Sequence, residues 1–145
     1  MGDSIVLSGV DGRLVLEASD YERPAALEVY DANWLKTRVS IQSGPFAGSF
    51  QAPFSTYDFA RLESHLSEAV RNLAGAIEFE SAEGDLTFSI KFSNRGTAGV
   101  SGVAKPNAFS GAALSFSFET DQSVLAEAVG PLTRLMRRLP VKEMQ

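Results

Sequence analysis

Residues 46–62 read FAGSFQAPFSTYDFARL, a stretch in which apolar residues first occupy alternate positions and then recur at helical spacing. The same change occurs in residues 114–125, which read LSFSFETDQSVL. Strict alternation is typical of a half-buried strand, whereas spacings of three and four residues are typical of an amphipathic helix. Both stretches therefore predict a strand that leads directly into a helix, as in a sheet with helices packed against it.

The remaining sequence predicts an α+β fold with a predominantly antiparallel curved sheet of about eight strands packed against two helices. Short alternating segments separated by Gly, Pro, Asn and Asp turn residues account for the strands. We expect a single domain over residues 1–145, with strands within 4–52 and 76–119 and helices over 56–74 and 121–139. A chain of this length can bury a core without disulfides or metals.

The predicted core is rich in phenylalanine. Alternation on both sides of the turn after Phe79 places this ring on the same face as Phe88, and the last strand adds Phe116 and Phe118. A large aromatic side chain at an inward position contributes strongly to stability because it removes much apolar area from water. These four residues are therefore expected to share one core.

Four local features are also expected. The strand alternation continues through Leu27 and Val29, and Gly75 ends the first helix as a left-handed cap. The irregular apolar spacing in the glycine-rich strand predicts a bulge near Gly102. Pro131 lacks an amide proton, so it should kink or split the last helix.

The composition excludes several functions. The chain has 44% apolar residues, a formal net charge of -5 and no cysteine. Without cysteine there is no disulfide framework, thiolate zinc site or thiol nucleophile. A net negative charge disfavours binding to nucleic acid or to anionic membrane. The start of the chain lacks a basic segment followed by a long apolar run, so we predict no secretory signal and a cytoplasmic location.

The sequence contains few residues and motifs of the kinds that carry out catalysis. His65 is the only histidine, and at the margin of an apolar helix face it is best interpreted as a solvated residue. The segment GVSG at 99–102 lacks the spacing of a nucleophile elbow, and GTAG at 96–99 lacks the lysine and helix of a phosphate loop. We therefore predict no enzymatic activity, no cofactor and no metal site.

Two groups of like charges need an explanation. Glu78 and Glu80 lie on one strand face about 7 Å apart, a separation that suits a glycosidase pair, but outward carboxylates lack a pocket that would raise one pKa. A solvated sheet face is the favoured interpretation. Arg134, Arg137 and Arg138 complement the negative end of the last helix dipole, and contact with an acidic ligand is the alternative.

Trp34 has two interpretations. Alternation in its strand puts it on the outward face with Lys36 and Arg38, where an indole beside cations often marks a protein contact. The alternative is that Trp34 packs beneath a helix or the N-terminal hairpin, because tryptophan is well buried on average. Under the first interpretation, these three residues are candidate partner-binding residues.

Several motifs resemble a known family. They are NWL at 33–35, GPFAG at 44–48, DF at 58–59, EGDL at 83–86, GTAGVSGV at 96–103 and FSFETDQSVL at 116–125. Together they resemble the small bacterial immunity proteins of the wall-associated-protein (WapI) type, over about residues 27–139. The resemblance implies a cytoplasmic protein that binds and blocks a cognate toxin and has no chemistry of its own. It implies no particular contact residues.

Two functions remain open at this point. In the first, an acidic domain occludes a toxin, such as a basic nuclease, through the exposed carboxylates Glu78, Glu80, Glu83 and Asp85, with electrostatic attraction speeding the encounter. In the second, the many phenylalanines line an apolar cavity between sheet and helices that binds a small molecule or supports an enzyme-like site. The second function requires a pocket in which polar groups converge.

Overall fold

The computed structural model describes residues 3–93, 95–107 and 111–143. These residues form eight antiparallel strands in two four-stranded sheets, with the order β1-β2-β3-β4 in the first and β5-β6-β7-β8 in the second. Two long helices and one single-turn helix complete the described part. The bounds are β1 Ser4–Gly9, β2 Gly12–Tyr21, α1 Val29–Ala32, β3 Trp34–Ser43, β4 Phe46–Ser55, α2 Thr56–Asn72, β5 Ala76–Glu80, β6 Leu86–Phe92, β7 Thr97–Ala104, β8 Leu114–Asp121 and α3 Gln122–Arg138.

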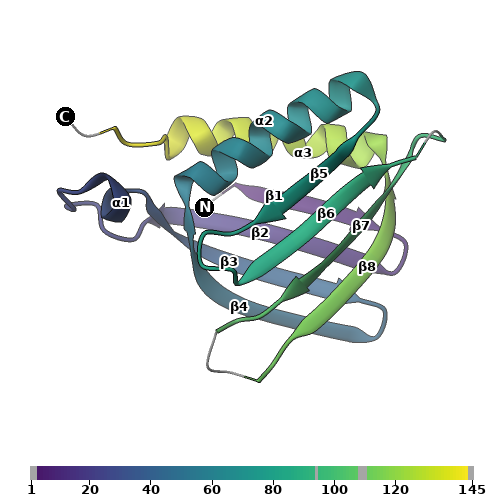
Figure 1. Ribbon diagram of the computed structural model, residues 1–145, viewed down its shortest axis with the longest axis horizontal. Coiled ribbons are helices and arrows are strands. Elements are labelled where there is room, and N and C mark those ends of the chain that lie inside the picture. The colour runs from purple at the N-terminus through teal and green to yellow at the C-terminus, as the bar shows by residue number, and fades with distance from the viewer. Residues whose placement is uncertain (1–2, 94, 108–110, 144–145) are drawn as a thin grey trace.

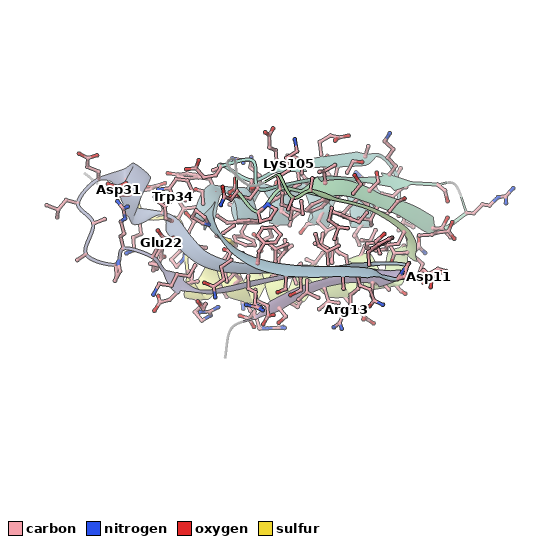
Figure 2. The ribbon with its side chains drawn as sticks, turned by 90° about the horizontal axis from the view of Figure 1, so that it is seen from below. Asp11, Arg13, Glu22, Asp31, Trp34 and Lys105 are labelled. Carbon is pink, nitrogen blue, oxygen red and sulfur yellow. The ribbon has the colours of Figure 1, made fainter. Side chains whose placement is uncertain are left out.

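The two sheets face each other, and α2 and α3 lie side by side along one end of the space between them (Figure 1). Side chains from both sheets fill this space (Figure 2). The sheets approach each other closely where the Val10 amide donates to the Glu119 carbonyl at 2.9 Å. The edge strands of the two sheets form no ladder with each other, so the sheets are not closed. Residues of β4 and the start of β8 line a surface hollow of about 260 Å³. The α+β class is confirmed, with its eight strands divided between two sheets.

The start of α2 forms a capping box. The Ser55 hydroxyl accepts a hydrogen bond from the Tyr57 amide, and the Asp58 carboxylate accepts one from the Ser55 amide at 2.9 Å. These bonds satisfy amide groups that have no partner within the helix. The apolar face of α2 then turns inward and buries Phe59, Leu62 and other residues against the sheets.

The predicted phenylalanine core is confirmed, because Phe79, Phe88, Phe116 and Phe118 are all buried. The Phe79 and Phe88 rings stack with centroids 4.7 Å apart. Phe54 at the end of β4 lies 5.9 Å from the Phe79 ring, so the aromatic contacts connect the two sheets. One cluster of buried apolar residues includes members of both sheets and both long helices.

The bulge predicted near Gly102 is wrong. Both ladders of β7 run without a register shift, and the irregularity in the described strands lies between Ala18 and Asp20 of β2. Gly102 sits on the inward face between Phe88 and Phe116, where an added Cβ would lie 2.7 Å from the Phe88 Cβ. The glycine therefore makes room for two rings and keeps the strand regular.

Three other local predictions change. Leu27 lies outside any strand and Val29 begins α1, so the alternation there does not mark a strand. The left-handed cap of α2 is Leu73, with a φ of 54°, while Gly75 takes a φ of 102° two residues later. Pro131 lies inside α3 without splitting it, since the helix extends from residue 122 to residue 138.

The C-terminal part of α3 packs against the start of the chain. Arg134 and Arg138 both pair with the Asp3 carboxylate, and Arg138 also donates to the Ala18 carbonyl at 2.9 Å and to the Ser19 carbonyl at 2.8 Å. These contacts give two of the three helix-end arginines partners within the chain. The helix covers β1, which is the edge strand of the first sheet.

Candidate functional site

The four predicted carboxylates occupy one short segment at the edge of the second sheet. Glu78 and Glu80 project outward from the edge strand β5, Glu83 lies in the following turn, and Asp85 directly precedes β6. The three glutamates are exposed and Asp85 is half-buried. We call these four residues the acidic edge.

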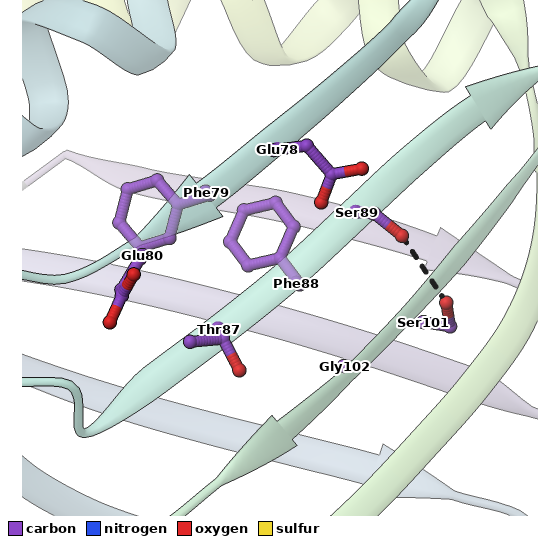
Figure 3. Close-up of a pocket in the computed structure, with 8 residues that line it drawn as sticks. All are labelled: Glu78, Phe79, Glu80, Thr87, Phe88, Ser89, Ser101 and Gly102. Atoms are coloured by element: carbon purple, nitrogen blue, oxygen red, sulfur yellow. Dashed lines mark hydrogen bonds between the residues drawn. The ribbon is translucent and has the colours of Figure 1, made fainter.

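A shallow hollow of about 350 Å³ lies on the outer face of the second sheet beside the acidic edge (Figure 3). Its polar lining consists of Glu78 and Glu80 together with Thr87, Ser89 and Ser101, and Phe79, Phe88 and Gly102 complete the lining. The Ser89 and Ser101 hydroxyls lie 3.4 Å apart and are hydrogen-bonded. The sequence indicated no pocket here, but the hollow is open to solvent, so the interpretation of a solvated sheet face holds.

The turn that carries Glu83 is held by buried groups. The Ser81 hydroxyl accepts from the Leu86 amide at 3.1 Å, and the Gly84 amide donates to the Ser81 carbonyl at 2.8 Å. The Asp58 carboxylate of α2 accepts from the Ala82 amide at 3.0 Å. The helix start therefore fixes the position of the turn, and the carboxylates are presented from a well-defined backbone.

Asp85 is the member of the acidic edge whose ionisation depends on its surroundings. Partial burial raises the pKa of its carboxyl, and the negative charge of Glu83 raises the pKa further. The folded protein thus disfavours the charged form. Since the pKa is higher in the folded than in the unfolded state, this group lowers stability as the pH rises from its ordinary value through the folded value.

We expect Asp85→Asn to stabilise the protein slightly at pH 7, within about 0.5 kcal/mol, and to have no effect at pH 3, where the carboxyl is protonated in both states. Urea unfolding at the two pH values measures this difference. Asp121→Ala serves as the control, because its expected change in the free energy of unfolding at pH 7 has the opposite sign. The Ser123 hydroxyl and the Val124 amide lower the pKa of Asp121, so its loss should destabilise at pH 7. A destabilising Asp85→Asn at pH 7 would contradict the expectation.

The predicted outward cluster at Trp34 is only partly present. Lys36 and Arg38 are exposed on the outer face of the first sheet, but Trp34 is 7% exposed, so the expected exposed indole is wrong and the alternative of a packed indole is right. Burial does not alternate there, because both Trp34 and Leu35 are buried at the start of β3. The partner-binding role of the three residues stays a prediction.

His65 is exposed on α2, as its place at the margin of the apolar face predicted. It lines an open hollow of about 470 Å³ together with Glu68 and Glu78.

Within residues 3–93, 95–107 and 111–143, no group of three or more His, Asp or Glu side chains could hold a metal ion. No helix among these residues is long and apolar enough to cross a membrane.

The structure also assembles a small site that the sequence did not predict. Trp34, Ser55, Tyr57, Asp58, Arg61 and Ala82 line a surface hollow of about 250 Å³ at the start of α2. We call it the α2 pocket. Asp58 could be recognised from the sequence only as a helix cap, because its contacts with Arg61 and Ala82 depend on how α2 packs beside the β5–β6 turn.

The fold and these surfaces describe an α+β protein that presents carboxylate and aromatic side chains on open surfaces. The family model for the immunity protein WapI-like family matches residues 6–140, nearly the whole chain, and the chain therefore belongs to that family. No curated protein matches the chain significantly.

Proposed function

We propose that this chain is an immunity protein that binds a cognate bacterial toxin in the cytoplasm and neutralises it without catalysis of its own. Membership of the WapI-like family supports a toxin as the partner. The observation that carries the proposal for this chain is the acidic edge, where four carboxylates project from a segment of eight residues. We also propose that the chain acts as one domain, because both sheets and both long helices share one apolar cluster.

The charge of the acidic edge supports a basic partner surface. Toxins that cleave nucleic acid bind phosphates with Lys and Arg side chains, so their binding sites are positively charged. A row of carboxylates on a protein with a net charge of -5 attracts such a surface and accelerates encounter. A nuclease is therefore the toxin class that we propose.

The packing of the described residues gives less support to the small-molecule alternative. Aromatic rings occupy the region between the sheets and α2, where the centroids of Phe54 and Phe59 lie 5.6 Å apart and those of Phe79 and Phe88 lie 4.7 Å apart. These rings are buried in the same apolar cluster as the other core residues. The phenylalanines are better explained as packing than as the lining of a binding cavity.

Reversing the acidic edge tests the proposal. With Glu78, Glu80, Glu83 and Asp85 all changed to Lys, association with the toxin domain encoded beside this gene should slow by at least about tenfold at low salt. The free energy of unfolding should change little, because these side chains lie on the surface or in a turn. Stopped-flow association rates measured from low to high salt would show the difference shrinking as ions screen the charges.

The matched control changes four exposed carboxylates outside the acidic edge, Asp20, Glu28, Glu127 and Glu143, to Lys. This variant has the same net charge as the first, so a slower rate confined to the acidic-edge variant assigns the effect to that surface. Equal association rates for the wild type and the acidic-edge variant at low salt would remove the acidic edge from the interface. The next candidates would then be Trp34, Lys36 and Arg38.

A further inference from the structure

We propose that the α2 pocket receives one apolar side chain of the basic toxin whose cationic surface contacts the acidic edge. This inference rests on the proposed function and adds to it the position of an apolar anchor. The anchor is a Leu, Met or Phe side chain flanked by Lys or Arg on the toxin. The pocket has the three properties that such an anchor requires, which are suitable walls, a rigid frame and a neighbouring charge of the right sign.

The walls are of the residue types that dominate binding energy at protein interfaces, namely Trp, Tyr and Arg. The buried Trp34 indole forms one wall, and Tyr57, which is 41% exposed, forms another. Arg61 also lines the pocket, and its charge is balanced because its guanidinium pairs with the Asp58 carboxylate at 2.8 Å. An apolar side chain would therefore meet a largely neutral surface.

The frame of the pocket is fixed before any partner binds. The Asp58 carboxylate accepts from the Ser55 and Ala82 amides, which ties the helix start to the turn. The Thr56 hydroxyl donates to the Asn33 amide oxygen at 2.6 Å, which ties the helix start to the residue before Trp34. A preorganised pocket loses little entropy on binding, and this favours affinity.

The neighbouring charge determines which partner fits. Ala82, at the rim of the α2 pocket, lies between Glu80 and Glu83 in the sequence, and the β5–β6 turn lies next to the start of α2 (Figure 1). Because Ala82 belongs to the same turn as Glu83, one toxin surface can contact both the acidic edge and the pocket. The exposed carboxylates of Glu80 and Glu83, which flank the Ser81–Ala82 segment in the sequence, disfavour an acidic partner and favour a basic one.

Tyr57→Ala tests this inference, since it removes one wall and leaves the backbone hydrogen bond from the Tyr57 amide to Ser55 in place. We expect binding to the inactivated toxin domain encoded beside this gene to weaken by roughly 10- to 30-fold. The loss should appear in the dissociation rate and persist at high salt, because an apolar contact is not screened. Ala82→Phe, which fills the pocket from an exposed position, should weaken binding similarly.

Two controls accompany these variants. Tyr57→Phe keeps the ring and should bind like the wild type. Phe46→Ala truncates another exposed aromatic residue, 67% exposed at the opposite end of β4, and should also bind like the wild type. Surface plasmon resonance gives both rate constants, and circular dichroism verifies that each variant is folded.

The outcomes separate the two proposals. If the wild type binds the toxin but Tyr57→Ala and Ala82→Phe bind equally well, the inference about the α2 pocket is wrong and the proposed function stands. A loss seen only in the association rate, and only at low salt, would also overturn the inference. If the wild type does not bind the toxin, the proposed function is rejected, and the inference is rejected with it.

Discussion

Replacing Phe88 with alanine is expected to lower the free energy of unfolding by about 3 to 5 kcal/mol. The Phe88 side chain is 3% exposed, stacks on Phe79 and lies directly across from Gly102, which has no side chain to fill the space. The truncation leaves a cavity in the middle of the aromatic contacts that connect the two sheets. Urea denaturation followed by circular dichroism measures the change.

The control for Phe88→Ala is Phe46→Ala, which removes the same ring from an exposed position on the same fold. Its effect should stay within about 0.5 kcal/mol. A loss below about 1 kcal/mol for Phe88→Ala would show that the inner face of β6 is not part of a tightly packed core.

Replacing Asp58 with alanine is expected to cost roughly 3 kcal/mol. The Asp58 carboxylate is buried and accepts from the Ser55 and Ala82 amides as well as from Arg61. Its removal deprives α2 of a cap and leaves the part-buried turn amide of Ala82 without its bond, and the loss of several hydrogen bonds to one charged group is costly. The acidic edge should then be less well ordered, which amide hydrogen exchange in the β5–β6 turn would detect.

Arg61→Ala distinguishes the two contributions to this effect. The Arg61 side chain is largely exposed, so the loss of its ion pair should cost less than about 1 kcal/mol. If Arg61→Ala and Asp58→Ala destabilise equally, the ion pair rather than the backbone hydrogen bonds holds the turn.

Local features of this fold were predictable because they depend on neighbouring residues. Short spacings account for the two strand-to-helix junctions, for the shared burial of the core phenylalanines and for the outward positions of Glu78 and Glu80. The division into two sheets was not predictable, since an alternating pattern sets the face of a side chain and not the sheet to which its strand belongs. The burial of Trp34 has the same origin, because distant segments pack at the start of β3.

The same distinction between local and long-range features applies to the acidic edge and the α2 pocket. The acidic edge is contiguous in sequence, so it could be proposed from the residues alone. The α2 pocket takes its walls from β3, the end of β4, the start of α2 and the turn after β5, and only the folded chain brings them together. No periodicity within one segment could have indicated it.

The packing of α3 on β1 also has a consequence for the order of events during protein synthesis. The ribosome completes β1 and β2 early, whereas Arg134 and Arg138, which reach Asp3, emerge only with the last helix. Until then the nascent chain carries an uncovered strand edge, the type of surface that pairs with other chains. The edge of the first strand can therefore be covered only after residues 122–138 have been synthesised, which makes the docking of α3 a late step.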